Sequence, residues 1–294
     1  MRQPSRLRAA RGFTLVEAIV SIVIIGILGA IVAVFIRAPM QGYADSVARA
    51  EASDEADLAL RRMAREIRLA LPNSVRVDAE GSTIEFLLTR TGGRYLAAED
   101  EARSGTPLDF VDPQKTTFTV VGGLQAAVLA TDYVVVYNLG PNMSPADAYG
   151  FATSERNIAS VAAAAKGATQ LVMADNPFAR NDAMPSPGRR FHIVSSPVTF
   201  RCETKGGKQV LTRYAGYNIR PNITDTMTGA GLKSSVLARR LDSCANLFRY
   251  DVGDAELRRS ALVLLSLGLS ARGAGDAEAR SVRLIHQVHV DNTP

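Results

Sequence analysis

One carboxylate in this sequence lies at the start of a long apolar run. Glu17 follows Phe13 by four residues and directly precedes residues 18–36, which carry no charge. Lipid offers a lone carboxylate no partner, so Glu17 must either stay near the interface or meet a cation. Cleavage after Gly12 would create that cation, because Phe13 would then carry a free, protonated amine. In low dielectric an ammonium group and a carboxylate attract each other far more strongly than in water.

The apolar run can be interpreted in three ways. As a helix, residues 18–36 span about 28 Å, close to the hydrocarbon thickness of a bilayer. A secretory signal peptide has a similar basic start but a shorter apolar core, and here Arg37 comes before any small-residue cleavage site. A plain anchor fits the length and leaves Gly12 and Glu17 without a role. Cleavage after Gly12 uses both residues, with Glu17 paired either to its own Phe13 amine or to that of a neighbouring chain.

The residues around this site resemble a known processing site. Gly-Phe-Thr-Leu-Val-Glu at 12–17 is similar to the processing site of type IV pilins and type II secretion pseudopilins. The resemblance implies that a prepilin peptidase cuts between Gly12 and Phe13 and that the new Phe13 amine is methylated. It also implies that Glu17 meets the terminal amine of a neighbouring subunit during assembly. The implied partners are the prepilin peptidase, other minor and major pilins, and the inner membrane.

Two later stretches extend the resemblance. Residues 65–77 and 286–292 resemble MshO-type minor pilins of MSHA pilus biogenesis and, more loosely, PilW-type minor pilins and the J minor pseudopilin of type II secretion. The resemblance implies a minor pilin, since major pilins are usually much shorter, with a minor pseudopilin as the alternative. A periplasmic adhesin or enzyme that uses the helix only as a tether is the alternative of a different class.

The basic charge of the chain comes mostly from its first residues. The formal net charge is +5, but residues 1–12 carry four arginines and no acidic residue. The rest of the chain contains 30 basic and 29 acidic residues. This nearly neutral composition does not support nucleic-acid binding. By the positive-inside rule the same arginines place the leader in the cytoplasm and the remainder in the periplasm. There Cys202 and Cys244 can form a disulfide, with two buried free thiols as the alternative.

The helical pattern continues beyond the apolar run. Residues 44–71 contain no Gly or Pro, and one apolar stripe consists of Leu60, Ala64, Ile67 and Leu71. The opposite face carries Arg61, Arg62, Arg65 and Arg68. With acidic residues nearby, this face is expected to be solvated, and contact with lipid head groups or a partner is the alternative. A kink or break is expected at residues 39–42, and Pro72 is expected to end the helix.

The rest of the sequence predicts an α+β, pilin-like fold, with a mainly antiparallel sheet packed on the second half of the helix. Strands are expected at 75–77, 83–89, 116–121, 133–139, 170–173, 191–203, 209–214, 261–269 and 281–290. Glycine pairs at 92–93, 122–123 and 206–207 are expected to form turns, the last within a hairpin.

These patterns define the expected segments. They are a leader at 1–12, a transmembrane and assembly helix at 13–36, a periplasmic helix half at 37–72 and a β-rich domain at 73–294. Prolines within residues 175–190 suggest that this domain divides there into two lobes.

No residue pattern supports catalysis. His286 and His289 lie three apart on a predicted strand, where alternation sends them to opposite faces, so they are poor joint metal ligands. Asp251, Asp254 and Glu256 could offer oxygen ligands to calcium, but their spacing is not that of an EF-hand. Common nucleotide-binding, hydrolase and zinc-protease motifs are also missing from the sequence. We therefore expect no enzyme, no cofactor, no bound metal and no small-molecule substrate.

Overall fold

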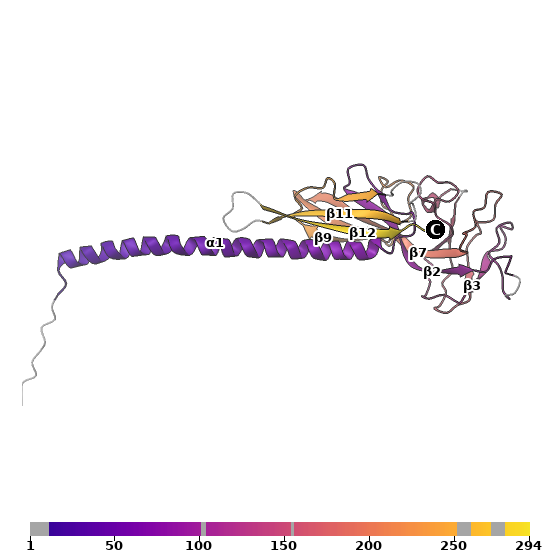
Figure 1. Ribbon diagram of the computed structural model, residues 1–294, viewed down its shortest axis with the longest axis horizontal. Coiled ribbons are helices and arrows are strands. Elements are labelled where there is room, and N and C mark those ends of the chain that lie inside the picture. Colours follow the sequence, from indigo (N-terminus) through magenta and orange to yellow (C-terminus); the bar gives the residue numbers. More distant parts are fainter. Residues whose placement is uncertain (1–11, 101–103, 154–155, 252–259, 272–279) are drawn as a thin grey trace, which may run out of the picture. The chain divides into compact units, whose positions relative to one another are not determined.

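The computed structural model describes residues 12–100, 104–153, 156–251, 260–271 and 280–294 (Figure 1). The predicted α+β class is confirmed, because an apolar N-terminal helix precedes a mainly antiparallel β-sheet domain. The chain divides into two compact units, Met1–Glu51 with Ala271–Arg280 and Ala52–Ser270 with Ser281–Pro294. The elements are α1 (Leu15–Ile67), β1 (Arg76–Val77), β2 (Thr83–Tyr95), β3 (Thr117–Val121), β4 (Tyr133–Val135), the 3-10 helix η1 (Ala148–Gly150), β5 (Ile158–Ser160), β6 (Gln170–Val172), β7 (Arg190–Lys205), β8 (Lys208–Ala215), β9 (Lys233–Arg239), β10 (Phe248–Asp251), β11 (Ser260–Ala271) and β12 (Arg280–Asp291).

The helix α1 runs without interruption from Leu15 to Ile67. The break expected at residues 39–42 is therefore wrong, because a proline removes a single intrahelical N–H and the hydrogen bonds on either side hold the helix. The end expected at Pro72 is also wrong. The Ala70 amide donates to the Ile67 carbonyl at 3.0 Å, and Ala70 then pairs with Leu88 of β2. The chain thus leaves the helix early to join the sheet.

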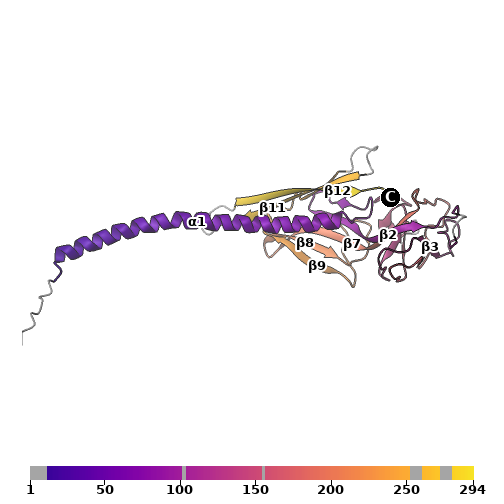
Figure 2. The same cartoon turned by 60° about the horizontal axis from the view of Figure 1, so that its bottom comes forward.

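The last part of α1 contributes to the core of the globular domain. The side chains buried on this part are Ala52, Ala56, Ala59, Leu60, Met63, Ala64 and Ile67. On the flank of this face, the Glu66 carboxylate accepts a hydrogen bond from Arg213 Nε of β8 at 2.7 Å. Glu55 accepts another from the backbone amide of Arg239 in β9. Figure 2 draws this part of α1 alongside β8 and β9. The burial of Leu60, Ala64, Ile67 and Leu71 confirms the predicted apolar stripe.

The larger sheet is built around β7. Its strand order is β5-β4-β7-β2-β3-β6, with β1 paired to β2 and with β8 and then β9 extending from β7. All of these pairings are antiparallel. Residues 175–190, where a division into two lobes was expected, lead directly into β7. Because β7 pairs with β2 and β4 from before this segment and with β8 from after it, one unit holds strands from both sides.

Two glycine pairs have different roles. The pair at 206–207 forms the predicted hairpin turn, with φ of 58° and 73° and with Lys205 opposite Lys208. The pair at 92–93 was expected to form a turn but lies inside β2. A Cβ atom on Gly92 would lie 2.9 Å from the Phe191 carbonyl oxygen, and one on Gly93 would lie 3.0 Å from the Phe191 ring. These glycines therefore allow β7 to approach β2 closely.

The predicted disulfide is present between Cys202 of β7 and Cys244, with 5.4 Å between the Cα atoms. It connects the larger sheet to the segment that leads into the smaller sheet, whose strand order is β10-β11-β12. Next to it, the Asp242 amide donates to the Gly268 carbonyl of β11 at 3.1 Å. Closing a loop with a sequence separation of 42 stabilises a fold by about 4 kcal/mol in the chain-entropy account.

A buried carboxylate on β2 forms ion pairs with two arginines. Glu85 is fully buried, and Arg76 Nε and Arg220 Nε each donate to one of its oxygens at 2.9 Å. The Tyr217 hydroxyl adds a third donor at 2.7 Å, and burial raises the pKa of Tyr217 well above its usual value. Because a buried charge is tolerated only when it is paired and hydrogen-bonded, this cluster fixes the segment after β8 to the sheet.

Candidate processing and assembly site

Thr14 lies directly before α1 and caps it. Its Oγ1 accepts a hydrogen bond from the Glu17 amide at 3.3 Å, and its carbonyl accepts one from the Ala18 amide at 3.1 Å. A threonine at the N-cap with a glutamate three residues later is the pattern of a capping box. Thr14 was not among the predicted site residues, although the Thr-x-x-Glu pattern at 14–17 predicts such a cap.

Glu17 lies exposed in the first turn of α1. Among the residues that the structure describes, no cation is within ion-pair distance of it. The N-terminal end of the helix dipole favours a carboxylate at this place. Gly12 and Phe13 precede the helix, and the Phe13 side chain is 78% exposed. In this uncleaved chain the Phe13 nitrogen is an amide rather than an amine. Cleavage, methylation and the pairing of Glu17 therefore stay predictions, and residues 1–11 of the leader lie outside the described ranges.

The first part of α1 exposes apolar side chains all around. Residues Leu15–Ile36 are long and apolar enough to cross a membrane, and none of them is buried. A signal sequence also passes this test, so length and composition alone do not define the role. The polar Ser21 is satisfied locally, because its Oγ donates to the Glu17 carbonyl at 2.7 Å. A helix that is apolar on every side needs lipid or neighbouring helices around it.

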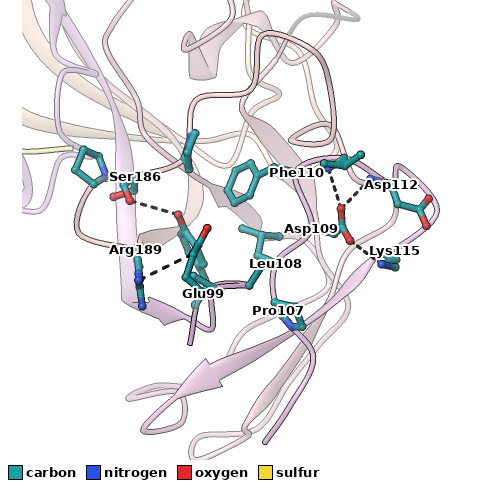
Figure 3. A pocket seen from close by; sticks show the side chains of 15 residues that line it. Glu99, Pro107, Leu108, Asp109, Phe110, Asp112, Lys115, Ser186 and Arg189 are labelled. Carbon is teal, nitrogen blue, oxygen red and sulfur yellow. Dashed lines mark hydrogen bonds and ion pairs between the residues drawn. The ribbon is translucent and has the colours of Figure 1, made fainter. Parts of the chain in front are cut away.

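The globular domain contains a cavity of about 590 Å³ between residues 95–99, 107–115 and 185–189 (Figure 3). Tyr95 and Phe110 form part of its wall, with 5.8 Å between the ring centroids. The Tyr95 hydroxyl donates to the Ser186 carbonyl, and burial raises the pKa of Tyr95 to about 12. This cavity was not predicted from the sequence. Its volume suits a small ligand. The prolines at 185 and 187 were its nearest sequence signal.

Charged side chains at the cavity are paired with one another. Asp109 accepts a hydrogen bond from Lys115 Nζ at 2.7 Å and others from backbone amides, which hold the pKa of Asp109 down to about 2. Arg189 bonds Asp100 and lies 4.0 Å from Glu99. These pairs fix the shape of the cavity and indicate no particular ligand.

Metal ligands are not grouped in the part of the chain that the structure describes: no three His, Cys, Asp or Glu side chains there could hold one ion. Asp251 of the acidic cluster is at the end of β10. Asp254 and Glu256 lie outside the described ranges.

The N-terminal segment matches a known protein family. Residues 7–33 match the family model described as the prokaryotic N-terminal methylation motif. The match includes Gly12, Phe13 and Glu17 together with most of the exposed apolar helix, and it supports a type IV pilin-like protein. It implies processing by a prepilin peptidase and assembly with other pilins. Neither the comparison with curated proteins nor the comparison with solved structures gave a match.

Proposed function

We propose that this chain is a minor type IV pilin with a structural rather than an enzymatic role. It is made as a prepilin, cleaved between Gly12 and Phe13, methylated at Phe13 and packed into a filament through α1, where it helps to initiate or cap assembly. The observation that carries this proposal is the methylation motif at 7–33 leading into a helix whose apolar side chains are exposed on all sides. A simple tether needs the helix but has no use for Gly12 and Glu17.

The start of α1 favours pairing of Glu17 with a neighbouring subunit. Residues four apart in one chain lie on the same face when both are helical. Phe13 lies before the Thr14 cap, and the helix begins only at Leu15. In this geometry the Phe13 amine of the cleaved chain is not held against its own Glu17, so the carboxylate is available to the amine of another subunit.

The resemblance at 65–77 and 286–292 supports a place in MSHA-type pilus biogenesis, and a minor pseudopilin of type II secretion is the alternative. In either machine the leader lies in the cytoplasm and the β-rich domain in the periplasm before assembly. A deletion scored for both pili and secreted enzymes separates the two systems.

Mass spectrometry of the N-terminus tests the processing step. Protein extracted from membranes should begin with N-methylated Phe13. A Gly12→Val variant should retain the leader, because the peptidase is expected to require the residue before the cut. An unprocessed Met1 terminus in the wild-type chain would refute the proposal.

Substitution of Glu17 tests the assembly step. Glu17→Val should leave cleavage largely intact and reduce the amount of the chain in sheared filaments by about tenfold or more, because a paired charge in low dielectric is lost. Glu51→Val, which removes an exposed acid from the same helix, is the matched control. If both variants enter filaments as well as the wild type, the helix is only a tether.

A further inference from the structure

On the exposed face of α1 in the globular domain, acidic and basic side chains occupy different parts of the helix. The exposed residues on this stripe are Asp54, Leu58, Arg61 and Arg65 of α1 and, in the turn directly after it, Arg68 and Leu69, with the half-buried Asp57 beside them. Acidic side chains thus come first and arginines last. The opposite face of the same helical segment is buried, so this stripe is the part of the segment that a partner can contact.

Part of this charge is not used within the chain. Arg61 Nε lies 2.7 Å from Asp57, and Arg62 Nε lies 3.4 Å from Glu66. Arg65 and Arg68 are exposed and have no ion-pair partner among the residues that the structure describes. Next to these charges, Leu58 and Leu69 expose 67% and 52% of their surface. The stripe therefore offers both unpaired cations and apolar side chains.

The residues of the stripe repeat with one spacing. Asp54 and Arg65 are 11 residues apart, and so are Asp57 and Arg68. The two exposed leucines, 58 and 69, have the same separation. On an α-helix 11 residues are about three turns, and they cover about 16 Å along the axis. Arg68, in the turn after α1, keeps the helical hydrogen bond to the Ala64 carbonyl at 3.2 Å, whereas the Leu69 amide donates to the Glu66 carbonyl in a tighter turn. A single displacement therefore places acid opposite arginine twice and brings Leu58 near Leu69 of the turn that follows the helix.

We propose that this stripe docks on the stripe of a second copy of the chain, with the two helices parallel and displaced by 11 residues. Residues 54–58 of one copy then face residues 65–69 of the other. The parallel direction rests on the proposed function, because two copies anchored in one membrane by the same helix have the same orientation. Charge complementarity between acidic and basic segments of one sequence identifies the occupant as a second copy.

This contact mainly determines the stagger of the two helices and contributes little to their affinity for each other. Exposed ion pairs add little binding energy, and charge complementarity mainly fixes register and excludes wrong partners. The membrane-spanning parts of the two chains supply the local concentration. A register shorter by one turn, a displacement of 7 residues, would set Leu58 of one copy against Arg65 of the other and lose the match.

Disulfide trapping in membranes tests the stagger. Two differently tagged full-length copies are produced together, one with Asp54→Cys and the other with Arg65→Cys, and the membranes are oxidised. Adjacent Cα atoms must come within about 7 Å to form a disulfide. We expect at least about fivefold more mixed dimer from this pair than from the control pair of Asp54→Cys with Arg68→Cys, which has the wrong stagger. Equal yields, or no mixed dimer, would overturn the proposal, as would capture of a different pilin at position 65.

Charge reversal tests the cause of the stagger. The trapping pair is now Asp57→Cys with Arg68→Cys, and the reversals are placed at 54 and 65 in the respective copies. Either Asp54→Arg or Arg65→Asp alone should lower the yield about fivefold, and the two together should restore it. If the double reversal is no better than the single ones, the charges do not set the register.

The same cells separate this inference from the proposed function. Filaments are sheared off and probed for the chain. If the chain enters filaments but the 54–65 dimer does not form, the stripe is not a docking surface and the minor-pilin role stands. If the dimer forms in membranes but the chain is excluded from filaments and keeps Met1, the pilin role fails and the paired helices remain.

Discussion

The first and last parts of α1 belong to one continuous helix and have opposite surroundings. In residues 15–36 every apolar side chain is exposed, as at Phe35 with 76%. In residues 52–67 an apolar stripe is buried, and Ile67 has no exposed surface. The second part alternates apolar with charged residues, and the first does not. The distribution of charged residues, rather than helix propensity, thus indicates which part of the helix packs against the rest of its own chain.

This difference means that a change in one part should leave the other unaffected. The last part depends on the β-rich domain, and the first part depends on lipid or on other subunits.

Removal of the disulfide is expected to give the largest loss of stability in the globular domain without an effect on the first part of α1. Replacing Cys202 and Cys244 with alanine should lower the free energy of unfolding of the globular domain by about 4 kcal/mol, since the closed loop is long. Denaturant unfolding of the full chain in mild detergent, followed by near-ultraviolet circular dichroism, measures the effect. The helicity of residues 15–36 should persist beyond this transition. Loss of both signals at one denaturant concentration would contradict the independence of the two parts.

A matched pair of isoleucines gives the next largest effect. Ile67→Ala should cost about 3 kcal/mol of domain stability, because it removes buried surface and leaves a cavity. Ile31→Ala removes the same atoms from a side chain that is 48% exposed, and it should leave the unfolding of the domain unchanged. Both variants are measured by the same denaturant titration. Equal effects would show that residue 31 also packs on the domain.

The features that follow from local pattern were predictable from the sequence. The apolar run, the stripe containing Leu60 and Ala64, and the glycine hairpin at 206–207 each depend on residues close together in the chain. The short strands β5, β9 and β10 were not predicted. Their pairing comes from distant segments, such as β4 for β5 and β8 for β9. Strand assignment then reflects tertiary context more than the preference of the residues themselves.

Features that depend on distant residues were missed for the same reason. Glu85 looks like an ordinary polar residue of a strand, and its burial depends on Arg76 and on Arg220, which is 135 residues away. The glycines at 92–93 have the composition of a turn, and only the closeness of β7 explains them inside a strand. At the candidate site, Gly12, Phe13 and Glu17 were chosen from the sequence pattern, whereas the cavity needed the fold.

Removal of the Thr14 cap is expected to have a smaller effect on stability, and only at the start of α1. Thr14→Val deletes the hydroxyl that accepts the Glu17 amide and should cost about 1 kcal/mol locally. Hydrogen exchange of that amide in detergent should accelerate about fivefold, and Thr14→Ser should restore protection. The unfolding of the domain should not change. Unaltered exchange in Thr14→Val would show that another group caps α1.

The smallest effect is a pH dependence confined to the globular domain. Burial lowers the pKa of His192 below 6.5, with Arg190 contributing and Asp291 opposing. Its Nε2 is buried and has no hydrogen-bond partner in the described part of the chain. The unfolded chain therefore binds a proton first, so stability is full above pH 6.5 and falls as the pH drops, by at most about 1.4 kcal/mol per pH unit. Unfolding at about pH 7.5 and about pH 5.5 should show this loss in the wild type and in His289→Gln, whose histidine is exposed, but a smaller loss in His192→Gln. The same loss in all three would assign the pH dependence to other groups.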